Sequence, residues 1–185
     1  DMQGIVVPLY FCPSRRDASI AVEYTQSGGH ILHALIDYAG ATPGPFVRSN
    51  GASETNRGEI LYEFWRDSVN TLQLNQTYHC IITRTLSSHP CRPAMITDGL
   101  SKTLLVSEKR LFVDRYESGD WMDDRGWTAG WSVDTMRSSG FAPEPDDRSK
   151  RSRPGLMQPG VDEIPRDELQ LGHQFGSAHA SGINA

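Results

Sequence analysis

The sequence has no excess of basic residues. Lysine and arginine number 18 against 23 aspartates and glutamates, so the net charge is −5 at pH 7. Proteins that bind nucleic acid normally carry a basic excess gathered on one face. The one basic run, residues 148–153, directly follows the acidic stretch 144–147, so their charges largely cancel. The balance argues against nucleic acid as a partner, and we expect the basic run to be a solvated loop.

The sequence also has no long apolar run. The most apolar stretch near the start, Ile5–Phe11, is too short to cross a bilayer and contains Pro8. No positively charged segment precedes it, so it does not have the form of a signal peptide. In a chain of 185 residues, these features predict a single soluble globular domain over residues 1–185 with a core of its own.

Cysteine is scarce, and an odd number of three cannot pair completely within one chain. Ten residues lie between Cys80 and Cys91, so these two could close a disulfide or remain unpaired in a turn-rich strand. His79 and His89 stand beside them and raise a zinc site as an alternative, although the spacing matches no common zinc motif. Cys12 is expected to be a small buried hydrophobic residue.

Common catalytic motifs are missing as well. The sequence has no nucleophile elbow, P-loop, dinucleotide-binding fingerprint or HExxH motif. Asp98 and Glu108 could serve as a pair of catalytic carboxylates. A turn is the simpler account of Asp98-Gly99, because aspartate bonds nearby backbone and glycine accepts a positive φ. We therefore expect no enzymatic activity and no bound cofactor.

What the sequence does contain is a cluster of acids and tryptophans. Its aspartates are Asp120, Asp123, Asp124 and Asp134, and its tryptophans are Trp121, Trp127 and Trp131. Oxygen-rich clusters can bind Ca²⁺, although this spacing lacks the alternation of an EF-hand. Exposed tryptophan faces could bind sugars. The simpler expectation is that Trp127 and Trp131 pack on a sheet with the acids in solvent.

The 17 glycines and 11 prolines break the chain often. They predict a strand-dominated α+β domain, an antiparallel sheet with long irregular loops and few short helices. Strands are expected at residues 6–11, 60–65, 103–108 and 126–133, a turn and helix start at 96–103, a break at 39–45, and a long irregular loop at 138–168. Residues 31–38 fit either a strand or a short helix. His30 and His33 could share a metal only if that stretch were helical, and no third ligand is in view.

Five short segments of the sequence together resemble one bacterial family. They are FCPS at residues 11–14, DYAG at 37–40, ITDGLSKTLLVSE at 96–108, the segment 126–137 beginning with Gly-Trp, and FGSAH at 175–179. They are similar, in order, to motifs of the domain of unknown function 1559 family of planctomycete-type bacteria. That family closes with a His, nine residues and Asp-Gly. Here His179 supplies the histidine, and the Asp-Gly does not follow.

The resemblance implies a pilin-like globular region. Family members carry an N-terminal apolar helix, which this chain lacks, so we expect the chain to be part of a longer protein attached to the membrane only through such a helix. The resemblance implies an extracytoplasmic pilin-like or pseudopilin-like structural or assembly protein that associates with itself or with other envelope proteins. The alternative is a carbohydrate- or Ca²⁺-binding envelope module that uses the tryptophans and aspartates above. Structural roles are implied for Cys12, Pro13, Asp98, Gly99, Glu108, Trp127 and His179.

Overall fold

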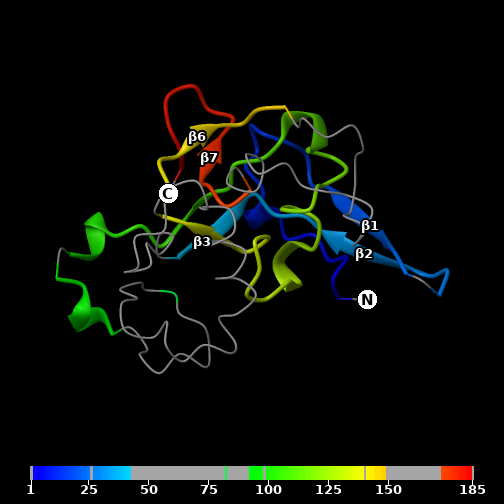
Figure 1. Ribbon diagram of the computed structural model, residues 1–185, viewed down its shortest axis with the longest axis horizontal. Helices are drawn as coiled ribbons and strands as arrows, with labels where there is room; N and C mark the ends of the chain where they lie inside the picture. Colours follow the sequence, from blue (N-terminus) through cyan, green and yellow to red (C-terminus); the bar gives the residue numbers. More distant parts are fainter. Residues whose placement is uncertain are drawn as a thin grey trace, which may run out of the picture.

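The computed structural model describes residues 2–25, 27–42, 82, 92–97, 99–139, 141–148 and 172–184. These ranges contain seven short strands and five single-turn 3-10 helices (Figure 1). The strands are β1 (Ile20–Tyr24), β2 (His30–Ala34), β3 (Tyr38–Thr42), β4 (Val106–Glu108), β5 (Met136–Ser138), β6 (Glu144–Pro145) and β7 (Gly176–Ser177). The 3-10 helices are η1 (Pro8–Tyr10), η4 (Pro93–Met95), η5 (Leu100–Lys102), η6 (Val113–Arg115) and η7 (Gly126–Thr128). The described part of the chain is therefore rich in strands, as predicted, and its helices are all short.

β1 and β2 form an antiparallel hairpin, with Tyr24 opposite His30. In its turn the N–H of Gly28 donates to the carbonyl oxygen of Thr25 at 3.0 Å. Gly28 has a φ of +82°, which glycine adopts without the steric cost of a side chain. The hairpin settles the ambiguity of residues 31–38 in favour of strands. On an extended chain His30 and His33 point to opposite faces, so they do not share a metal.

The central sheet has the order β4-β3-β5. β3 runs antiparallel to β4, with Tyr38 opposite Glu108, and parallel to β5, with Gly40 opposite Met136. A Cβ on Gly40 would lie 3.0 Å from Sδ of Met136, so a glycine is needed for this close packing. The expected break at residues 39–45 is thus wrong for residues 39–42, because pairing on both sides holds this glycine- and alanine-rich stretch extended.

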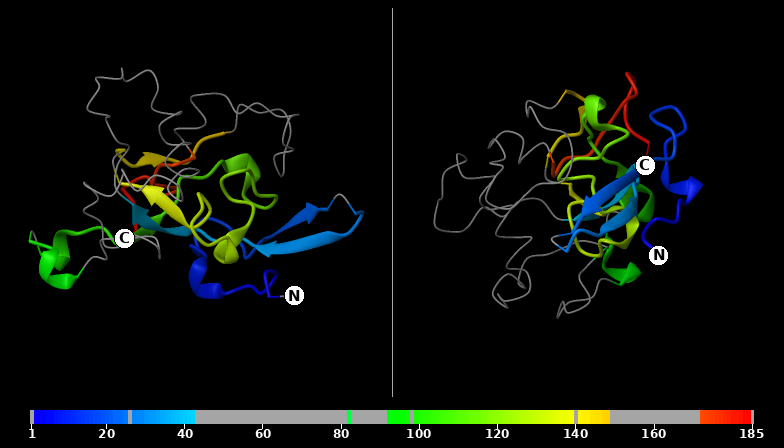
Figure 2. Two further views of the ribbon diagram at one scale, coloured as in Figure 1. Left: turned by 60° about the horizontal axis from the view of Figure 1, so that its bottom comes forward. Right: turned by 90° about the vertical axis from the view of Figure 1, so that its right-hand side faces the viewer.

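β6 and β7 pair in parallel, with Glu144 opposite Gly176. An isolated antiparallel bridge joins Lys109, just after β4, to Phe175, just before β7. The expected antiparallel sheet is therefore only partly right, since β3–β5 and β6–β7 are parallel pairs. The β1–β2 hairpin projects from one end of the described body, and η4 and η5 lie at the opposite end (Figures 1 and 2).

The core combines small apolar clusters with buried charges. One cluster contains Phe11, Ala21 and Leu35, and another contains Ala39, Ala41 and Phe175. The largest fully buried side chains, however, are those of Arg137 and Lys109. Buried charges are costly unless they are paired and hydrogen-bonded. The buried charges of this core must therefore be paired and hydrogen-bonded if the fold is to be stable.

Two predicted strands are wrong. Residues 6–11 contain η1 in place of a strand, because Pro8 opens the helix at its first position and lacks the N–H that a strand would use. Residues 126–133 form η7 followed by turns. Gly126 and Gly130 have φ values of +59° and +70°, and a Cβ on Gly126 would overlap the carbonyl oxygen of Ala34. A side chain at 126 would therefore push the segment off the hairpin.

Other predicted elements are shorter than expected. The strand at 103–108 is confirmed only as β4, and the turn and helix start at 96–103 contain the single turn η5, which has no side-chain cap. β6 lies within the predicted loop 138–168. The predicted strand at 60–65, most of that loop, Cys80, Cys91 and Asp98 lie outside the described residues. No helix in the described ranges is long and apolar enough to cross a membrane.

Candidate functional site

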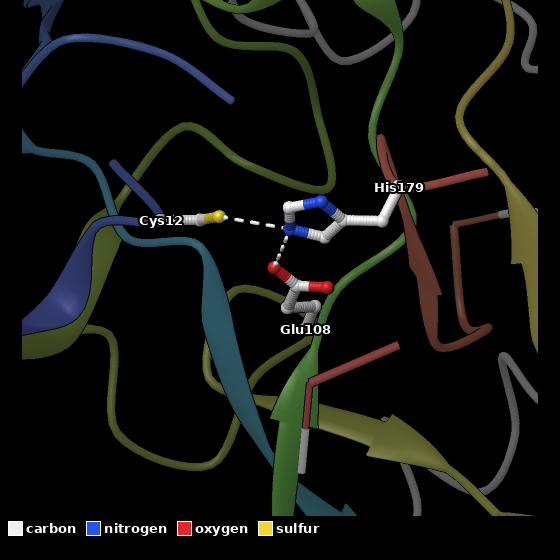
Figure 3. A group of neighbouring side chains, drawn as sticks. All are labelled: Cys12, Glu108 and His179. Atoms are coloured by element: carbon white, nitrogen blue, oxygen red, sulfur yellow. Dashed lines mark hydrogen bonds and ion pairs between the residues drawn. The ribbon is translucent and has the colours of Figure 1, made fainter. Parts of the chain in front are cut away.

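Three side chains from distant parts of the sequence meet at one point (Figure 3). Nε2 of His179 lies 3.4 Å from Sγ of Cys12 and 3.3 Å from Oε1 of Glu108. One ligand-capable atom from each residue lies within 4.8 Å of the others. Among the described residues this is the group of three that could hold a metal ion. We call it the Cys–Glu–His cluster.

The turn after η1 positions Cys12. Pro13 occupies the second position of a turn that closes with the N–H of Arg15 donating to the carbonyl oxygen of Cys12 at 3.0 Å. The N–H of Cys12 donates to Oδ2 of Asp37 at 2.8 Å. The cysteine is only 2% exposed. The expectation of a buried residue is correct, but its sulfur faces polar atoms, so it is not simply a small hydrophobic residue.

Glu108 ends β4 and is held from several sides. Its Oε2 accepts hydrogen bonds from Oγ of Ser177 at 2.5 Å and from the N–H of Asn184 at 3.1 Å. Its Oε1 accepts from Nδ2 of Asn184 at 3.1 Å. Burial by itself raises the pKa of Glu108, but these hydrogen bonds, together with Cys12 and Arg15, outweigh it and hold the pKa below its ordinary value. The carboxyl is therefore an anion at neutral pH.

His179 follows β7, and its own N–H donates to Oγ of Ser177 at 3.0 Å. Besides Cys12 and Glu108, its Nε2 has Oγ of Ser14 at 3.4 Å and Nδ2 of Asn184 at 3.1 Å. One imidazole nitrogen carries either one proton or one lone pair, so it makes one hydrogen bond at a time. Four polar atoms therefore lie around Nε2 of His179, which can form a hydrogen bond with only one of them at a time. The resemblance implies a structural role for His179, and the structure brings its side chain to Cys12 and Glu108.

A separate set of buried ionisable side chains lies beside this cluster. Nε of Arg16 is 2.7 Å from Oδ1 of Asp37, and its Nη1 is 2.6 Å from Oδ2 of Asp123. Nζ of Lys109 is 2.5 Å from Oδ1 of Asp123. Burial alone raises the pKa of Asp123, but Arg16 and Lys109 overcome this and hold it below its usual range. We call these four residues the buried charge network.

The predicted acidic cluster is built into this interior. All four aspartates are buried, so the expectation that they lie in solvent is wrong. Asp134 accepts hydrogen bonds from Oγ of Ser132 and from the N–H groups of residues 124 and 125, and Asp120 accepts from the N–H of residue 121. Burial, followed by the nearby Asp134, raises the pKa of Asp124 to about 9. The carboxylates of Asp120, Asp123 and Asp134 already bond protein groups.

The three tryptophans of this stretch are half-buried, and their side chains differ in what they contact. Trp121 packs against His173 with ring centroids 5.8 Å apart. Nε1 of Trp127 donates to the carbonyl oxygen of Ile5 at 3.0 Å, which joins η7 to the N-terminal segment. Trp131 lies in the turns that follow η7. The predicted strand that would carry Trp127 and Trp131 does not form, and Trp127 lies in η7 instead.

Sequence reasoning identified the members of the Cys–Glu–His cluster one at a time and did not join them. The signal that could have joined them is chemical: three of the five resembling segments each contribute one residue able to bind a metal or a proton. Gly99, in one of the same segments, has a φ of +92°, as expected of a turn glycine.

These observations define a class of protein: a strand-rich domain in which distant segments join around buried ion pairs and one Cys–Glu–His cluster. The chain belongs to the family described as "Protein of unknown function (DUF1559)", since the family model SBP_bac_10 matches residues 1–185. The resemblance noted in the sequence is thereby confirmed. No curated protein and no solved structure matches the chain.

Proposed function

We propose that the protein is a pilin-like or pseudopilin-like structural or assembly protein of the cell envelope, located outside the cytoplasm and without enzymatic activity. The observation that supports this proposal is how the family segments are used. Residues 11–14 bind residues 37–40 through the N–H of Cys12 and the carboxylate of Asp37. Residues 96–108 bind residues 175–179 through Glu108 and Ser177. The segments that carry family membership join parts of the chain to one another.

A fixed body of this kind suits a protein whose role is to be assembled. Its partners would be further copies of the chain or other envelope proteins. Assembly subunits must keep one shape while their surfaces contact neighbours, and buried, fully bonded contacts between distant segments provide that rigidity. Membership of the family supports the proposal without naming a molecular activity.

Location and partners can be tested together. The protein, tagged in its native host and cross-linked in intact cells, is expected in the envelope fraction, joined to itself or to envelope proteins. A cytoplasmic marker protein serves as the control for lysis. Recovery with that marker, free of cross-links, would contradict the proposal.

The alternative of a Ca²⁺- or carbohydrate-binding module has less support. Both carboxylate oxygens of Asp123 contact cationic side chains, so they are not open to a hard cation. Calorimetric titration with Ca²⁺ and screening on a glycan array would decide the matter. Heat from Ca²⁺ or specific glycan binding would favour the alternative.

A further inference from the structure

We propose that Cys12, Glu108 and His179 form a binding site for Zn²⁺, a role that goes beyond the proposed structural function. The ligands would be Sγ of Cys12, Oε1 of Glu108 and Nε2 of His179. The sequence predicts no cofactor, and the zinc alternative it raises, at Cys80 and Cys91, lies elsewhere in the chain. The new site rests on side-chain geometry.

The distances between the ligand atoms fit a tetrahedral metal. Zinc binds sulfur at about 2.3 Å, nitrogen at about 2.0–2.1 Å and oxygen at about 2.0–2.2 Å. At a tetrahedral angle these lengths place sulfur about 3.6 Å from nitrogen, and nitrogen about 3.4 Å from oxygen. The observed separations are 3.4 Å between Sγ and Nε2 and 3.3 Å between Nε2 and Oε1. These two separations match those of a tetrahedral site, and Sγ and Oε1 lie within 4.8 Å of each other.

The charges and lone pairs also fit a cation. Nε2 of His179 makes one hydrogen bond at a time, although four polar atoms lie within 3.4 Å of it. A metal ion between the three atoms accepts a lone pair from each of them simultaneously. Carboxyl and thiol ligands bind a metal in their deprotonated forms. The two anions together balance the charge of a divalent cation.

The surrounding residues hold the ligands in place. Ser177 and Asn184 fix the carboxylate of Glu108, while Asp37 fixes the backbone of Cys12. Such outer contacts orient ligands and raise metal affinity. The side chain of His179 is 31% exposed, which gives an ion a path from solvent. With three protein ligands, the fourth position of a bound zinc ion would be taken by water.

The ligand set selects zinc over other candidates. Ca²⁺ and Mg²⁺ require several oxygen ligands, and here one ligand is sulfur and one is nitrogen. Cys12 and His179 could also be read as a nucleophile and its base. Cys12 is only 2% exposed, so a substrate carbonyl cannot approach its sulfur in this conformation. A single metal ion needs far less space.

The test is a titration of the metal-free chain with Zn²⁺ and, for spectroscopy, with Co²⁺. We expect one ion per chain, and with Co²⁺ a thiolate-to-metal charge-transfer band and intense visible bands typical of tetrahedral coordination. Cys12→Ser should abolish the charge-transfer band. His179→Ala, at a partly exposed position, should weaken zinc binding by more than ~100-fold, because it removes a direct ligand. Ser177→Ala, which only loosens Glu108, should weaken it ~10-fold.

The matched control is the double variant Cys80→Ser/Cys91→Ser, which removes the other two thiols. It should keep full zinc affinity and the cobalt spectrum. Loss of binding in this control, with retention in Cys12→Ser, would place the metal at the other cysteines and overturn the proposal. Equal zinc affinity of the wild type and His179→Ala would also overturn it. So would rapid alkylation of Cys12 that depends on His179 in a chain that takes up no metal, which would favour the nucleophile. Circular dichroism on each variant establishes that it is folded.

Discussion

The buried charge network and the Cys–Glu–His cluster both remove ionisable side chains from water, but they differ in how those groups are satisfied. In the network, the two oxygens of Asp123 bind Lys109 and Arg16, and those of Asp37 bind Arg16 and the N–H of Cys12. Two cations face two anions, and every carboxylate oxygen has a donor. The network is complete within the protein.

In the cluster, by contrast, the carboxylate of Glu108 accepts from the neutral donors Ser177 and Asn184, and three atoms able to bind a metal converge. Four polar atoms lie within 3.4 Å of Nε2 of His179, which makes a single hydrogen bond. The carboxylates of both sets have donors. Those of the network face arginine and lysine side chains, whereas that of the cluster faces a partly exposed histidine.

The largest expected effect comes from breaking the network at Asp123. Asp123→Asn leaves Lys109 and Arg16 without a shared anion in a place where neither reaches water. Removing one partner of a buried ion pair typically costs about 3–5 kcal/mol. Urea unfolding of the metal-free chain at pH 7 measures the change. Asp17→Asn, at an exposed aspartate, is the control and should stay within about 0.5 kcal/mol of the wild type. A cost below about 1 kcal/mol would mean that the network does not hold the core.

A second effect, of comparable size when summed over several pH units, sharpens the comparison through pH. Burial and the nearby Asp134 raise the pKa of Asp124 to about 9, so it is neutral in the folded chain at pH 7 and ionised in the unfolded chain. The folded state then binds one more proton, and this group lowers stability as pH rises from about 4 to about 9. Asp124→Asn removes that dependence.

The slope that Asp124 contributes is about 1.4 kcal/mol per pH unit at most. Urea unfolding of the wild type and of Asp124→Asn from pH 5 to pH 8 measures this slope. The free energy of unfolding of the variant should rise relative to that of the wild type as pH rises. Parallel curves would contradict the prediction. Asp123 has a lowered pKa, so its contribution has the opposite sign: it is present above about pH 4 and is lost on further acidification.

The smallest expected effect is that of His179→Ala on the metal-free chain. The side chain is partly exposed and its contacts compete for one nitrogen, so its loss should cost less than about 1 kcal/mol. Thermal melts with a chelator measure this cost, and His30→Ala, at an exposed histidine, is the control. With excess zinc, only the wild type and the control should gain melting temperature, since a ligand stabilises the state that binds it. A large loss with chelator and no zinc effect would make His179 a structural residue like Asp123.

Local pattern predicted part of this fold. The apolar, β-branched stretch 103–108 does end in a strand, and the glycines and prolines do mark a chain with short elements. Residues 126–133 were predicted wrongly because alternating side chains suggested a strand, while Gly126 and Gly130 hold positive φ values that strands do not use. Residues 39–42 are predicted to break regular structure but form a strand. Partner strands on both sides hold this glycine- and alanine-rich stretch extended.

The polar interior was beyond sequence reasoning for a different reason. Aspartate, lysine and arginine are normally exposed, and only tertiary contacts show which of them are buried in pairs. The cluster depends on contacts over still longer distances, because Cys12, Glu108 and His179 belong to segments that no local pattern connects. Its members could be named from the sequence, but their meeting point could not.

The contact between Cys12 and His179 spans 167 positions of the chain. With a metal bound, this contact would close most of the polypeptide into a ring, with Glu108 dividing the ring into two loops. A single backbone cut in either loop would then leave two pieces held at one shared ion. Such a link would add to contacts that already join distant segments, such as Arg16 with Asp123, so a nicked molecule would hold together more firmly with the metal bound than without it.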